Sequence, residues 1–92
     1  MALQITEKNG VFYLHGKINT STVIPFTTHF EYMITQNKKV TINIDHVIEI
    51  DRDGLKAMKK LTYIASENHK VFLIIGYGCK DIYDDFNSSQ VA

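Results

Sequence analysis

The spacing of apolar residues changes sharply in the middle of this chain. Residues 40–45 read Val-Thr-Ile-Asn-Ile-Asp and alternate apolar with polar side chains, as a strand with one buried face does, and Ile48 and Ile50 repeat the spacing of two. Intervals of three and four, typical of an amphipathic helix, then take over at Leu55, Met58, Leu61, Ile64 and Ala65. The chain is therefore predicted to pass from a strand almost directly into a helix.

Residues 51–54, Asp-Arg-Asp-Gly, occupy this junction. Asp51, or Asp53 in its place, is the predicted N-cap, because a carboxylate there accepts unpaired backbone N–H groups at the positive end of the helix dipole. Gly54 allows the backbone to turn sharply or to approach another segment closely. A well-capped turn explains this chemistry on its own, but open α/β sheets also present their sites where a strand gives way to a helix.

Length and composition exclude several classes of protein. Ninety-two residues, of which 45% are hydrophobic, suffice for one domain over residues 1–92. Ten basic residues balance ten acidic ones, and no basic cluster alternates with aromatic residues, so we expect no nucleic-acid partner. No signal-like leader or apolar run of about 20 residues is present, which predicts no membrane association. The single cysteine, Cys79, fits a reducing compartment, so we expect a cytoplasmic protein.

The first half of the chain predicts a hairpin followed by a helix. Residues 3–6 and 11–15 have strand composition, and the Asn9-Gly10 pair between them is a strong hairpin signal, so the first strand should run antiparallel to the second. Residues 16–22 are predicted to form a loop that ends in a cap at or near Thr22. A helix should follow and end at Asn37, with its apolar stripe formed by Val23, Phe26, Phe30, Met33 and Ile34.

The second half should alternate helix and strand. The second helix is expected to close at residues 67–69, a fourth strand to cover residues 71–75 and a turn to cover residues 76–79. A last short helix would carry Ile82, Tyr83 and Phe86 on one face, and residues 86–92 are expected to form a flexible tail.

These elements predict an α/β fold with a mixed four-stranded sheet, in which the first strand is antiparallel and the other three are parallel. In the third strand, the polar residues Thr41, Asn43 and Asp45 point away from the apolar side. We therefore expect the helices to lie mainly on one face of the sheet and to leave the other face wetter.

Three segments in this order resemble the STAS domain, the fold of bacterial anti-sigma factor antagonists. They are residues 16–19 before the first helix, residues 40–47 in the third strand and residues 50–55 at the start of the second helix. The family pattern is roughly Gly-x-Leu-Asp before the first helix and Ile-Asp-Ser-Ser-Gly-Leu before the second. The likeness covers nearly the whole chain, although the family's terminal extra strand and helix are not evident, so it implies a short member.

The resemblance implies a function in partner switching. In this family the unmodified antagonist binds an anti-sigma factor that is also a serine kinase, and phosphorylation of the serine before the glycine breaks the complex. Asp53 occupies that position, and its single charge imitates only part of the −1.5 to −2 charge of phosphoserine. Asn19 and Asn43 stand where the family has aspartates. If both cluster around the second helix start, as the resemblance implies, the charge of the site has been redistributed.

The resulting hypothesis is a non-enzymatic regulatory module that binds a protein partner, of which an anti-sigma factor kinase is the implied example, without a cofactor or metal. Its proposed partner-binding residues are Asn19, Thr20, Asp51, Arg52, Asp53 and Gly54.

Two catalytic or metal-binding alternatives have little support. Asp51 and Asp53 could act as paired carboxylates or as a receiver-like phosphoacceptor, but the earlier strand end supplies His15 and Asn19 rather than the acids of a Mg²⁺ site. Four histidines share no ligand spacing, and surface or capping roles account for His15, His29, His46 and His69.

Two binding alternatives remain open. Some STAS domains bind nucleotides or lipids, and the wet sheet face could host such a ligand. Self-association as a homodimer is the other alternative. It is motivated by the strand edges and by four tyrosines, Tyr13, Tyr63, Tyr77 and Tyr83.

Overall fold

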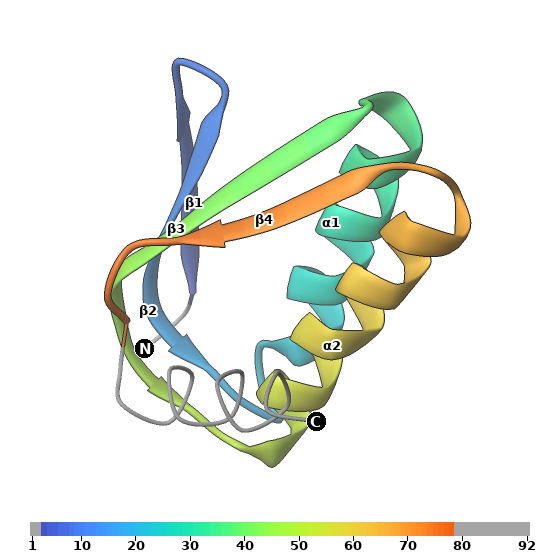
Figure 1. Ribbon diagram of the computed structural model, residues 1–92. Coiled ribbons are helices and arrows are strands. Elements are labelled where there is room, and N and C mark those ends of the chain that lie inside the picture. Colours follow the sequence, from blue (N-terminus) through green and yellow to red (C-terminus); the bar gives the residue numbers. More distant parts are fainter. Residues whose placement is uncertain (1–2, 79–92) are drawn as a thin grey trace.

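The structure, a computed structural model, describes residues 3–78. Its elements, drawn in Figure 1, are β1 (Gln4–Lys8), β2 (Val11–Ile18), α1 (Val23–Gln36), β3 (Lys39–Ile50), α2 (Arg52–Glu67) and β4 (Val71–Ile75). The four strands form one sheet in the order β1-β2-β3-β4, in which β1 pairs antiparallel with β2 and the other pairs are parallel. The predicted fold class is confirmed.

Both helices lie side by side on one face of the sheet (Figure 1), as the polar face of β3 predicts. Phe26, Phe30 and Ile34 of α1 and Met58 and Leu61 of α2 are almost completely buried. The predicted helical stripes therefore point at the sheet, and the same residues that define the spacing form the core. Neither helix of residues 3–78 is long and apolar enough to cross a membrane.

The hairpin between β1 and β2 is tighter than predicted. Lys8 pairs with Val11, so the connection contains only Asn9 and Gly10, whose φ angles are 54° and 81°. Positive φ at both positions is the requirement of a two-residue type I′ turn, which Asn-Gly satisfies. The Asn9-Gly10 signal is thus confirmed, and the strand itself extends two residues beyond the predicted end.

Irregular pairing between β2 and β3 overturns two expectations. Register shifts between Tyr13 and His15 and between Gly16 and Lys17 each leave one extra residue on β3. A bulge of this kind reverses the side-chain alternation of its strand. Ile48 is therefore 65% exposed instead of pointing inward with Ile50. The prediction for Ile48 was wrong.

The second expectation concerns residues 16–18, which the sequence predicts as loop. They continue β2 and pair with the last residues of β3 as far as Ile18 opposite Ile50. Gly16 locally favours a loop, but pairing with β3, which is distant in the sequence, keeps these residues in a strand. The bounds of α1, its Asn37 C-cap and the limits of β4 are confirmed, whereas Cys79, the predicted last helix and the 86–92 tail lie outside the described residues.

Candidate functional site

Two loops meet at the carboxyl ends of β2 and β3. Ile18 and Ile50 end these neighbouring parallel strands opposite one another, and the Asp51 backbone N–H donates to the Ile18 carbonyl oxygen at 3.1 Å. The residues that follow each strand are consequently adjacent. This is the edge of a parallel sheet at which α/β proteins present binding sites.

Asp51 links the two loops and caps α2. One carboxylate oxygen, Oδ1, accepts from the Gly54 backbone N–H at 2.9 Å. The other, Oδ2, accepts from the Thr20 backbone N–H at 3.0 Å and from the Thr20 hydroxyl at 3.2 Å. The N-cap is therefore Asp51 rather than Asp53, and the same side chain holds Thr20 against the start of the helix.

Asp53 lies next to this contact and remains exposed. The Thr20 hydroxyl also donates to Asp53 Oδ2 at 3.1 Å. A hydroxyl carries a single proton, so Thr20 Oγ1 shares it between the two carboxylates. Asp53 occupies the first turn of α2, where the helix dipole favours a negative charge. Thr20, Asp51 and Asp53 together form what we call the Thr20 clasp.

Hydrogen bonding lowers the pKa of Asp51 below its usual value of 3.8. The backbone N–H of Gly54 makes the largest contribution, and together with the Thr20 N–H and hydroxyl it outweighs desolvation, which opposes the shift. Donors aimed at a carboxylate stabilise its charged form. The clasp is accordingly built around an ionised Asp51.

Replacing Asp51 by asparagine should remove the acid-dependent part of the stability that this residue supplies. Because the pKa of Asp51 is lower in the folded than in the unfolded protein, its contribution is fully present above about pH 4 and is lost as the pH falls through the folded-state pKa. Asparagine caps helices as well as aspartate does, so the cap survives the substitution. Urea midpoints measured between neutral and acidic pH should show the wild type losing its advantage over Asp51→Asn below about pH 4.

Glu67→Gln, at the exposed end of α2, is the control for this measurement. It should show no such convergence with the wild type. A constant difference between wild type and Asp51→Asn at every pH would contradict the assignment of the charge effect to Asp51.

Gly54 allows the start of α2 to pack closely against the strand ends beneath the site. It is buried, and a Cβ atom at this position would lie 2.6 Å from Ile50 Cγ1 and 2.7 Å from the Ile18 carbonyl oxygen. Only glycine lets the first turn of α2 approach both strand ends so closely. The predicted role in close approach is confirmed. Arg52 is exposed, and its side chain makes no hydrogen bond or ion pair with any residue between 3 and 78.

Comparison with protein-family models gives no match, and neither does comparison with curated protein sequences. Solved structures do match. SpoIIAA, a cell-fate determinant of Bacillus, in its phosphorylated form aligns with 97% of this chain and 84% of its own at 12% identity, with a TM-score of 0.76. The chain has the SpoIIAA-like fold.

Two further structures share this fold. The anti-sigma factor antagonist SpoIIAA in its unphosphorylated form aligns over 97% of this chain and 99% of its own, at 7% identity and a TM-score of 0.62. A Shewanella loihica protein with a SpoIIAA-like fold aligns over 95% of this chain and 75% of its own, at 17% identity and a TM-score of 0.54. At these identities the likeness establishes architecture, and it confirms the fold that the STAS resemblance implied.

Within the SpoIIAA-like fold, the two asparagines of interest lie in different places. Asn19 directly follows β2, and its Oδ1 accepts from the Ser21 backbone N–H at 2.9 Å. Asn43 lies seven residues before Ile50 on β3, and its Oδ1 accepts from the Asp45 backbone N–H at 2.8 Å. The expectation that both cluster around the start of α2 is wrong for Asn43. Only Asn19 adjoins the Thr20 clasp.

Thr22 supports the loop in a way that the sequence does not reveal. It is the N-cap residue of α1, but its side chain makes no capping hydrogen bond. Its buried hydroxyl instead accepts from the Asn19 N–H at 2.9 Å and donates to the Lys17 carbonyl at 2.9 Å. Thr22 thereby holds the loop that carries Thr20. A threonine before a helix suggests a cap first, so this internal role had no distinctive signal.

The sheet brings together two histidines that the sequence separates. His15 and His46 are partners on β2 and β3, and their rings stack 4.8 Å apart at an interplanar angle of 6°. Near-parallel rings direct their nitrogen lone pairs side by side, whereas a shared metal needs them to converge at about 2.0–2.1 Å from one ion. No group of three potential metal ligands occurs within residues 3–78.

A cavity of about 450 Å³ adjoins the loop that carries Thr20, because Ser21 and Thr22 are part of its lining. Its lining includes Ile5 of β1 together with Phe26 and His29 of α1. The sequence suggested the open sheet face as a ligand site, but this cavity is on the side of the sheet that the helices cover.

Proposed function

We propose that this chain is a non-enzymatic regulatory module that binds a protein partner in the manner of an anti-sigma factor antagonist. The supporting observation is the position of Asp53. It is exposed at the start of α2 in a SpoIIAA-like fold, immediately before the buried Gly54, and its carboxylate accepts a hydrogen bond from Thr20. By the family resemblance, this is the position of the phosphorylated serine.

The proposed binding surface consists of the Thr20 clasp with Asn19 and Arg52 beside it. Asp51 stabilises the structure of this surface, because its carboxylate accepts three hydrogen bonds. The Asp53 carboxylate has one described hydrogen-bond partner, Thr20, and it is exposed to an incoming group. Arg52 adds an exposed guanidinium that can form a bidentate contact with a carboxylate. Gly54 belongs to the surface only by allowing the close packing beneath it.

Asp53 would set the module in one state. A serine changes from neutral to a charge of −1.5 to −2 when phosphorylated, whereas an aspartate keeps a charge of −1 at neutral pH. The partner should therefore recognise a constant negative charge beside Thr20. An anti-sigma factor kinase is the partner class that the resemblance suggests, which would place the module in the bacterial cytoplasm as a regulator of transcription.

A quantitative pull-down that compares the protein partners of Asp53→Ser with those of the wild type tests this proposal. We expect the affinity for the principal partner to change by about tenfold or more, equivalent to about 1.4 kcal/mol, because the constant charge is lost. Asp53→Asn keeps the side-chain size and removes only the charge. If charge is what the partner reads, Asp53→Asn should resemble Asp53→Ser in this assay.

Glu67→Ser, at the far end of α2, removes an exposed carboxylate outside the proposed surface and is the matched control. It should retain wild-type binding. Identical partners and affinities for the wild type, Asp53→Ser and Asp53→Asn would reduce Asp53 to a favourable charge at a helix start and refute the proposal.

A further inference from the structure

Within the described residues, β4 is an edge of the sheet and has an unusually apolar outer face. Three of its five side chains point away from the helices: Val71 is 46% exposed, Leu73 39% and Ile75 41%. The strand Val-Phe-Leu-Ile-Ile contains no charge, proline or glycine. Figure 1 shows β2 and β3 between this edge and β1.

The opposite edge lacks these properties. β1 has the sequence Gln-Ile-Thr-Glu-Lys, and all of its residues except Ile5 are exposed. Charged residues on an edge strand discourage pairing with another chain, and natural sheets commonly use them for that purpose. β1 has this protection and β4 does not. Among residues 3–78 the backbone of β4 pairs only with β3, so its other side is suited to accept a further strand.

We propose that β4 pairs antiparallel with β4 of a second copy of this chain, centred on Leu73. A two-fold axis at Leu73 places Val71 opposite Ile75, Phe72 opposite Ile74 and Leu73 opposite itself. Every facing pair is then apolar, on both faces of the joined sheet. A two-fold interface requires such self-complementarity, and the apolar pattern of β4 supplies it.

The residues that flank β4 are compatible with this arrangement. In the same register, Lys70 faces Gly76 of the second copy, so the two lysines do not meet. Lys70 Nζ is turned toward its own chain, where it donates to the carbonyls of Thr35 and Asn37 at 3.3 Å. The chain has no net formal charge, so long-range repulsion between copies is small.

The paired strands would leave the proposed binding surface accessible. β4 pairs with β3 only as far as Asn43, whereas the Thr20 clasp follows Ile50, seven residues farther along β3. A dimer through β4 would therefore present two copies of the Thr20 clasp. This inference does not depend on the proposed function, since it concerns another part of the sheet.

Sedimentation equilibrium of the full chain over a range of concentrations tests the proposal. The wild type should show a monomer–dimer equilibrium, and Leu73→Lys should weaken dimerisation at least tenfold, because two ammonium groups would face each other across the axis. Leu73 is partly exposed on the open face, so lysine is compatible with the fold, which circular dichroism would verify. Thr6→Lys adds the same charge to the open face at the opposite edge and should dimerise like the wild type.

A charge-reversal mixture makes the test specific to the proposed axis. Leu73→Lys and Leu73→Glu should each be monomeric alone, and an equimolar mixture of the two should form a heterodimer, because residue 73 faces residue 73. A wild type that stays monomeric would overturn the proposal, as would a dimer that Leu73→Lys leaves intact. The proposal also fails if the β4 amides that are not hydrogen-bonded to β3 are protected from hydrogen exchange independently of concentration, which would show that the chain covers its own edge.

Discussion

Replacing Gly54 by valine is expected to lower the free energy of unfolding by about 3 kcal/mol, the upper part of the range for overpacked sites. The added Cβ would overlap Ile50 Cγ1 and, more seriously, the carbonyl oxygen of Ile18. That oxygen cannot withdraw freely because it accepts from the Asp51 N–H and so joins the two strand ends. Equilibrium urea denaturation would measure the loss, and Gly54→Ala should show a smaller one.

Lys56→Val is the matched control, since Lys56 is exposed on the same helix and two residues further along. It introduces the same β-branched side chain without the contact with Ile18. A Gly54→Val protein as stable as Lys56→Val would show that α2 can move away from the strand ends, and the close approach would then not define the site.

Phe30→Ala is expected to cost about 3–5 kcal/mol, the usual range when a buried aromatic residue is removed. Phe30 is completely buried, and its ring makes edge-to-face contacts with the rings of Phe12, Phe26 and Phe72, at centroid distances of 5.3–6.2 Å. A loss of this size is a large share of the roughly 5–15 kcal/mol typical of a folded domain. The urea midpoint should fall steeply, and the unfolded population should become measurable in native buffer.

Tyr32→Ala provides the comparison, because Tyr32 lies on the same helix and is 61% exposed. Its effect should stay within about 1 kcal/mol. Similar losses for the two variants would contradict the central position of Phe30 in the core.

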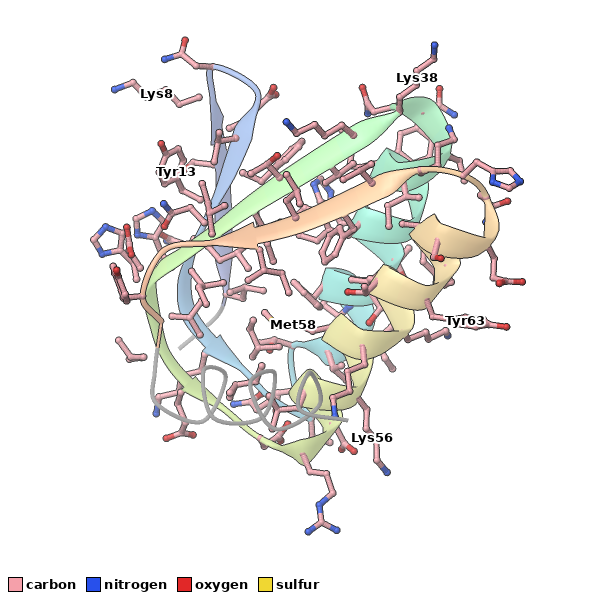
Figure 2. All side chains as sticks on the ribbon, viewed as in Figure 1. Lys8, Tyr13, Lys38, Lys56, Met58 and Tyr63 are labelled. Carbon is pink, nitrogen blue, oxygen red and sulfur yellow. The ribbon has the colours of Figure 1, made fainter. Side chains whose placement is uncertain are left out.

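Figure 2 shows the side chains that fill the space between the sheet and the two helices, where Met58 also lies.

Much of the fold follows from local sequence patterns. The spacing of Leu55, Met58 and Leu61 predicts α2 because a helix with this pattern has one apolar face to bury. Met58 and Leu61 are fully buried in the structure, and Leu55 is partly buried. Asn9-Gly10 predicts the hairpin because few other residue pairs tolerate two positive φ angles. These signals act within a few residues of the chain, so tertiary packing did not need to be known.

The errors have a common physical origin in pairing between distant strands. Ile48 is exposed because two bulges change the side-chain alternation of β3. A bulge depends on how a strand pairs with its neighbour, which here is β2. The same irregular register brings His15 beside His46. The register between β2 and β3 is not determined by the sequence of either strand alone, so the spacing of apolar residues within one strand could not have predicted it.

The candidate site divides in the same way. Sequence by itself determined the strand-to-helix junction and the capping carboxylate, because each depends on the backbone conformation of a few consecutive residues, whereas the need for glycine at position 54 comes from its close approach to Ile18 as well as Ile50. Only the tertiary structure decided that Asp51 is the cap, that Thr20 contacts both carboxylates and that Asn43 lies apart from them. These facts depend on where β2 ends relative to β3, which is set by hydrogen bonding across the sheet between residues about thirty positions apart in the chain.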